Sequence, residues 1–107
     1  MAVYKAEIGN RKPTHPGELM REVLGELGLS TSVAAENMRV TRQALHRTLK
    51  GLGALTEDMA LRFGALTGVN AEMLIQMQHS LSMWRARRIV ARELARIAER
   101  RNELIAA

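Results

Sequence analysis

TRQALHRTLKG, residues 41 to 51, carries the strongest structural signal in this chain of 107 residues. Thr41 is a typical helix N-cap, and Gly51 is typical of the residue that follows a helix end. Leu45 and Leu49 are four positions apart, so they share one face of a helix and predict a buried edge. The opposite edge carries Arg42, Gln43, His46 and Lys50.

This polar edge has the chemistry to recognise DNA bases. An Arg side chain pairs bidentately with O6 and N7 of guanine, and a Gln side chain pairs in the same way with adenine. Arg42 and Gln43 are therefore candidate base-reading residues, and Lys50 adds a charge attracted to phosphate. Polar outer faces are also the norm for solvated helices, so composition alone leaves both interpretations open.

The residues before this segment complete a helix-turn-helix pattern. Ser30 suits the N-cap of a preceding helix, and a tight turn at residues 39 and 40 leads to Thr41. In such a pair, the second helix enters the major groove of DNA by its N-terminal end. At the start of the first helix, hydroxyl and backbone N–H groups hold phosphate without reading sequence. The candidates for this role are Ser30, Thr31 and Ser32.

Three more helices are predicted around this unit. Pro16 suits a helix start and Gly28 its end, and Thr56 begins another helix that Gly68 ends. Asn70 opens the last one. The buried positions expected in the first of these are Leu19, Met20, Val23, Leu24 and Leu27, and in the second Met59, Leu61, Phe63 and Leu66.

The predicted fold is all-α, with five helices and an extended last one. No Gly or Pro occurs from residue 71 to the end, so a single helix of roughly 50 Å is expected there. We predict an N-terminal arm over residues 1–15, a helix-turn-helix DNA-binding domain over residues 16–84, and a basic C-terminal helix over residues 85–107. Val and Ile seldom alternate with polar residues, so no strand is predicted.

The C-terminal segment holds most of the net charge of +5. Seven Arg and three Glu lie within residues 85–107. An apolar stripe near heptad spacing, interrupted by Arg101, favours pairing with a second copy of the helix. The stripe consists of Val90, Leu94, Ile97 and Leu104. A row of Arg92, Arg96 and Arg100 on another face is compatible with solvent, an acidic protein partner or DNA phosphate.

Several other function classes are disfavoured. The chain has no Cys, its three His are scattered, and Asp58 is its only Asp, so we expect no metal site and no cofactor. No nucleophile motif or phosphate loop occurs, which argues against an enzyme. Three aromatic residues are too few for stacking single-stranded bases. Neither a signal peptide nor a membrane span is present, so a soluble cytoplasmic protein is expected.

Five separated motifs give the chain a family resemblance. They are His15-Pro16-Gly17-Glu18-Leu19, Leu29-Ser30, Val40-Thr41-Arg42-Gln43-Ala44-Leu45-His46-Arg47, Leu55-Thr56-Glu57-Asp58-Met59-Ala60-Leu61-Arg62 and Met83-Trp84-Arg85-Ala86-Arg87. In this order they resemble the HigA-type antitoxins, which belong to the Xre group of helix-turn-helix proteins, over about residues 14 to 87. The resemblance implies a lambda-repressor-like fold and a homodimer that represses its own operon at a palindromic operator. It also implies a partner, a HigB-like mRNA endonuclease toxin that the antitoxin neutralises.

The resemblance also assigns positions. It aligns Thr41, Arg42, Gln43, His46 and Arg47 with the recognition helix, and residues 30–32 with the phosphate-facing helix start. Arg39 stands where the family usually has Gly, and a left-handed conformation there costs on the order of 1 kcal/mol. Either the turn differs, or Arg39 accepts this strain and offers a further phosphate contact.

Two alternatives to a DNA-binding antitoxin stay open. Ala34 and Thr48 are smaller or more polar than the Leu and Ile usual in the family, which predicts looser packing between the two motif helices. Together with Arg39, this is compatible with a protein-binding antitoxin that binds DNA weakly or not at all. The third possibility is a stand-alone Xre-type regulator that has no toxin.

Overall fold

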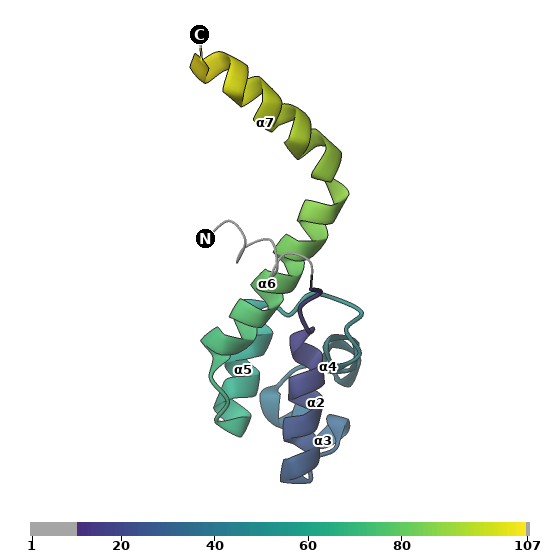
Figure 1. The fold of residues 1–107 in the computed structure, drawn as a ribbon. Helices are drawn as coiled ribbons and strands as arrows, with labels where there is room; N and C mark the ends of the chain where they lie inside the picture. Colours follow the sequence, from purple (N-terminus) through teal and green to yellow (C-terminus); the bar gives the residue numbers. More distant parts are fainter. Residues whose placement is uncertain (1–10, 107) are drawn as a thin grey trace.

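The structure, a computed structural model, describes residues 11–106, and this part of the chain is all-α (Figure 1). Six helices occur there and no strand. Their bounds are α2 Pro16–Leu27, α3 Thr31–Met38, α4 Arg42–Leu49, α5 Glu57–Thr67, α6 Ala71–Ile89 and α7 Ala91–Ala106. The all-α prediction is confirmed. Most of the predicted N-terminal arm lies outside the described residues.

The predicted helix starts are confirmed by their capping bonds. In each case a side chain before the helix accepts a backbone N–H three residues on, which satisfies a donor that the first turn leaves without a helical partner. The pairs are Ser30 with Val33 at 3.1 Å, Thr41 with Ala44 at 3.0 Å, Thr56 with Met59 at 3.2 Å and Asn70 with Met73 at 3.0 Å. Gly28 and Gly68 end α2 and α5 in left-handed conformation, as predicted.

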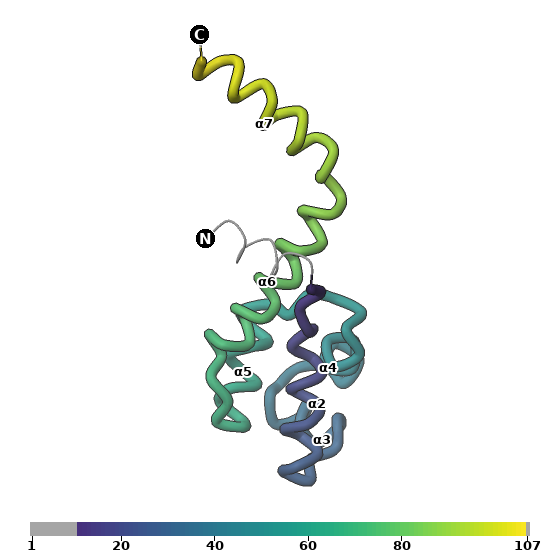
Figure 2. Tube along the Cα trace, in the orientation of Figure 1, coloured from purple at the N-terminus to yellow at the C-terminus, as the bar shows by residue number. Residues whose placement is uncertain are grey.

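The core lies between α2, α3, α4, α5 and the first half of α6. Met20, Leu45 and Phe63 are fully buried at its centre, and Leu74 joins them from α6. Figure 2 shows α2 passing between α4 and α6, and α2 packs against both. Two predictions of burial were wrong, because Leu61 and Leu27 are 62% and 51% exposed at the edges of α5 and α2.

His15 and Gly17 join the start of α2 to the rest of the body. The His15 Nδ1 atom accepts the Gly17 N–H at 2.9 Å, and its Nε2–H donates to the Gly53 carbonyl at 2.9 Å. A Cβ at Gly17 would overlap the Thr48 carbonyl oxygen at the end of α4. His15 therefore positions the start of α2, and α2 touches the backbone of α4 directly.

The expected single C-terminal helix is two helices, so the count of five was wrong. Val90 has φ −103° and ψ 13°, which interrupts the helix between α6 and α7. The last fully buried side chain of α6 is Leu81, and Trp84 one turn later is half-buried, so the body holds little of the helix beyond Trp84 in place. Absence of Gly and Pro permits a continuous helix but does not enforce one. Figure 1 shows α7 projecting away from the body, and the molecule is 61 Å long.

Candidate nucleic-acid interface

α4 presents the polar edge that the sequence predicts. Leu45, Thr48 and Leu49 are buried against the neighbouring helices, so the opposite side of α4 is left toward solvent. Arg42 and Gln43 are exposed in its first turn. Of the other candidates on this helix, Thr41, Arg47 and Lys50 are exposed and His46 is half-buried.

The candidate phosphate-binding residues open α3. The Ser30 hydroxyl oxygen accepts the Val33 N–H, which leaves its proton available as a donor. Ser32 is exposed and Thr31 is half-buried. This end of α3 therefore combines hydroxyl donors with the positive end of a short helix dipole.

Arg39 forms the turn between the two motif helices in left-handed conformation. Its φ is 59° and its ψ is 44°, and its N–H donates to the carbonyls of Ala35 and Glu36. The N–H of Val40 donates to Ala35 at 3.1 Å, which completes a helix end normally built on Gly. Arg39 thus accepts the strain, and its side chain is exposed.

Arg62 of α5 stabilises this turn by hydrogen bonds, a role that was not predicted from the sequence. Its Nη1 donates to the Met38 carbonyl at 2.9 Å and to the Arg39 carbonyl at 3.4 Å. Its Nε pairs with Asp58 at 2.9 Å. The sequence signals only this last pair, because the two residues are four apart on one helix. The partners in the turn are more than twenty residues earlier and leave no local trace.

Gln78 fixes the loop that follows α4, and it too was missed. Its side chain is 6% exposed; Oε1 accepts the Leu55 N–H at 2.8 Å and Nε2 donates to the Ser82 hydroxyl at 3.0 Å. The segment between α4 and α5 is thereby tied to α6. Gln78 could not be identified from the sequence, because no pattern of residue spacing distinguishes a buried side-chain amide on a helix from an exposed one.

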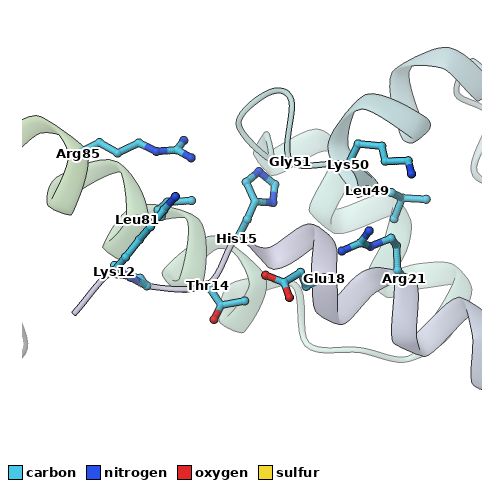
Figure 3. Close-up of a pocket in the computed structure, with 11 residues that line it drawn as sticks. Lys12, Thr14, His15, Glu18, Arg21, Leu49, Lys50, Gly51, Leu81 and Arg85 are labelled. Carbon is cyan, nitrogen blue, oxygen red and sulfur yellow. The ribbon is translucent and has the colours of Figure 1, made fainter.

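Lys50 lies apart from the other candidates. It caps the C-terminal end of α4, about 13.5 Å along the helix axis from Thr41 at 1.5 Å per residue. It lines a polar cleft of about 380 Å³ between the starts of α2, the end of α4 and α6 (Figure 3). Lys12, Arg21 and Arg85 also line this cleft, with Glu18 among them. Of the predicted site residues, Arg39, Thr41, Arg42 and Gln43 therefore lie near the α3–α4 turn, residues 30–32 lie at the opposite end of α3, and Lys50 lies at the far end of α4.

The described residues suggest no other kind of site. Within residues 11–106, no group of three or more His, Asp or Glu side chains is placed to hold a metal ion. None of the six helices is long and apolar enough to cross a bilayer. What the arrangement offers chemically is a set of hydrogen-bond donors and positive charges on the exposed side of α4.

Known proteins share this arrangement. No family model matches the sequence. The chain is 31% identical over 75 residues to the uncharacterized HTH-type transcriptional regulator YddM of Escherichia coli (strain K12), which covers 70% of this chain and 80% of YddM. Among solved structures, an addiction module antidote protein of the HigA family from Coxiella burnetii superposes with a TM-score of 0.72 and 25% identity, over 80% of this chain and 95% of that one. The Pseudomonas aeruginosa antitoxin HigA, solved with the higBA promoter, gives a TM-score of 0.71 at 25% identity, over 78% and 91%.

Proposed function

Because this chain belongs to the HigA-type antitoxins, a group of HTH-type transcriptional regulators, we propose that it is a homodimeric repressor that binds a palindromic operator in double-stranded DNA. The observation that carries the proposal is the first turn of α4, in which Arg42 and Gln43 are exposed while Leu45, one turn later, is buried. A similar protein from P. aeruginosa was solved with promoter DNA, which supports the same use of this surface.

The proposed contacts divide into two kinds. Arg42 and Gln43 read base edges in the major groove, with Thr41, His46 and Arg47 beside them. The phosphate contacts are Ser30, Thr31, Ser32, Arg39 and Lys50. We assign DNA binding to residues 16–84, and pairing or partner contact to residues 85–107. Two recognition helices of a dimer then enter successive major grooves about 34 Å apart.

Binding to the DNA upstream of the protein's own gene tests the base-reading residues. Each bidentate contact to a base is worth about 1–3 kcal/mol, so Arg42→Ala and Gln43→Ala should each weaken specific binding roughly ten- to a hundredfold in a gel shift. Arg92→Ala removes the same charge from exposed α7, where DNA contact would be to phosphate only, so it should leave the ratio of specific to non-specific binding unchanged and is the matched control. If Arg42→Ala leaves the ratio of specific to non-specific binding unchanged, the assignment of base reading to α4 is wrong.

We also propose that the protein neutralises a HigB-like mRNA endonuclease in the cytoplasm. The support is the likeness to two solved antitoxins of the HigA type. Co-purification of the product of the adjacent gene tests this, and a growth assay with that product expressed alone and with the antitoxin shows whether it is a toxin. An adjacent product that neither binds nor harms growth indicates a stand-alone regulator.

A protein-binding antitoxin with weak DNA contact is the second candidate, and the strained Arg39 turn favours it. Gel shifts at two salt concentrations, run beside the co-purification, separate the two. Capture of the toxin without specific DNA binding at the lower salt concentration supports the second candidate and contradicts the repressor.

A further inference from the structure

α7 carries an apolar stripe that the rest of residues 11–106 leaves uncovered. The stripe begins at Val90, the residue just before α7, and continues with Leu94, Ile97 and Leu104 of α7. None of the side chains of α7 is buried, and these four residues are 40%, 46%, 61% and 66% exposed. Their spacing of four, three and seven residues is that of a coiled-coil seam, with Arg101 at the missing position. Figure 2 shows α7 standing clear of the other helices, so the stripe is accessible along its length.

We infer that α7 pairs in antiparallel orientation with α7 of a second copy, with Leu94 of each chain opposite Ile97 of the other. This inference rests on the homodimer of the proposed function and specifies its contact. On one side the stripe is flanked by Glu93 and Arg100, and on the other by Ala91 and Ala98. Small residues on one flank permit close approach of the two helices.

The flanking charges select this register. With Leu94 opposite Ile97, Glu93 of one chain lies beside Arg100 of the other, and the two-fold axis repeats the pair. A shift of one heptad either way places Glu93 beside Glu93, or Arg100 beside Arg100. Like charges in such positions disfavour the pairing, so the alternatives are disfavoured electrostatically.

Parallel pairing is disfavoured by Arg101. In parallel register the two Arg101 side chains meet inside the seam, and neither copy supplies an acid opposite them. In the antiparallel register Arg101 lies opposite Val90, near the end of the paired segment, where its guanidinium reaches water. The two Val90 positions are then about 17 Å apart along the pair, at 1.5 Å per residue.

The ion pairs within each α7 do not prevent the formation of the Glu93–Arg100 pairs between chains. Glu93 pairs with Arg96 at 3.5 Å and Arg100 with Glu103 at 2.7 Å, all of them largely exposed. Exposed pairs of this kind contribute little to stability, so replacing them with pairs between chains costs little.

Charge exchange tests the pairing by sedimentation velocity at low salt. Glu93→Arg and Arg100→Glu each place like charges in contact twice per dimer, so each variant alone should dimerise at least tenfold more weakly than the natural chain. An equimolar mixture of the two restores both opposite-charge pairs and should form a heterodimer. Arg92→Glu makes the same charge change on the opposite face of α7 and should leave the dimer unchanged.

Cross-linking tests the orientation. The chain has no Cys, so single cysteines report unambiguously. With a short bis-maleimide, a mixture of Ala91→Cys and Ala98→Cys should cross-link faster than either variant alone, because positions 91 and 98 face each other only in the antiparallel register. Faster linking within Ala98→Cys alone indicates parallel helices and overturns the inference.

Other outcomes are equally decisive. A natural chain that is monomeric at all concentrations, a mixture that fails to recover the dimer, or an adjacent gene product that covers α7 in place of a second copy each overturns the α7 pairing. These measurements contain no DNA, so failure here is separate from failure of Arg42→Ala to alter promoter binding. Equal thermal unfolding of all variants confirms that the body remains folded.

Discussion

Arg39 is the one non-glycine residue between positions 11 and 106 with a positive φ. A Cβ in this conformation costs on the order of 1–2 kcal/mol. The turn keeps its shape because Arg39 and Val40 donate N–H bonds to α3 and Arg62 donates to the Arg39 carbonyl. The turn therefore keeps the left-handed conformation of Arg39 at a cost in stability that a glycine would not carry.

Arg39→Gly should raise the free energy of unfolding by about 0.5–1 kcal/mol, since relief of strain exceeds the added freedom of the unfolded chain. Urea unfolding measures this. Arg39→Ala keeps the strain and should gain little. Equal stabilisation by both variants would show that the charge of Arg39, and not its backbone, is the destabilising feature.

Gly17 and Gly25 lie on the same helix and should respond in opposite directions to alanine. Gly17→Ala pushes a methyl group into the Thr48 carbonyl and should destabilise by about 1–3 kcal/mol, because backbone must move. Gly25 has open space around it, and Gly25→Ala should stabilise by about 0.5–1 kcal/mol. Thermal unfolding compares them, and a neutral Gly17→Ala contradicts the close contact of α2 with α4.

The role of a residue could be predicted from the sequence only where its partner lies a few positions away in the chain. The capping residues were predictable because each acts on an N–H three positions away. The buried face of α4 was predictable because Leu45 and Leu49 lie four residues apart and so share one side of the helix. Arg62 and Gln78 act across 23 or 24 residues, so only the folded chain reveals what they hold.

At the scale of the element, α6 illustrates that helix length depends on support. Its first three turns pack on the body through the buried side chains of Leu74 and Leu81, whereas the residues after the half-buried Trp84 are exposed. No Gly or Pro occurs in α6 or α7, and this led to the incorrect prediction of one long helix. Tertiary contacts, which the pattern does not contain, set the point where the helix breaks.

Gln78→Leu should cost about 1–3 kcal/mol, because it leaves the buried Leu55 N–H without an acceptor. Hydrogen exchange of the Leu55 amide should accelerate more than that of the α2 amides, since the loop loses its attachment to α6. Gln76→Leu changes an exposed residue of the same helix and should have little effect. Unchanged exchange at Leu55 would mean that another group holds the loop.

At the scale of the whole molecule, the sequence predicted the fold class better than it predicted how the parts are arranged in space. An all-α body of this size follows from the spacing of its apolar residues, and the outward edge of α4 follows with it. Net charge carries no direction, so charge alone assigned Lys50 to the DNA surface, and the structure places it in the cleft beside His15 and Arg85. The bend that directs α7 away from the body was equally hidden.

The salt dependence of DNA binding tests the role of Lys50. Each phosphate that a cation neutralises contributes about 0.9 to the slope of log affinity against log salt concentration. If Lys50 contacts phosphate as proposed, Lys50→Ala should reduce this slope by about 1 and weaken specific and non-specific binding alike. An unchanged slope, measured by fluorescence anisotropy, would assign Lys50 to the cleft and not to DNA.

The isolation of α7 has a consequence for how its order depends on abundance. A lone helix of 16 residues that buries nothing is only marginally stable in water. Its helical content should therefore rise as copies meet and fall on dilution, which circular dichroism across a concentration series detects; a constant signal would mean that α7 needs no partner. Because folding of α7 is coupled to pairing, α7 is ordered when the protein is abundant. When the protein is scarce, α7 frays and becomes accessible to proteases.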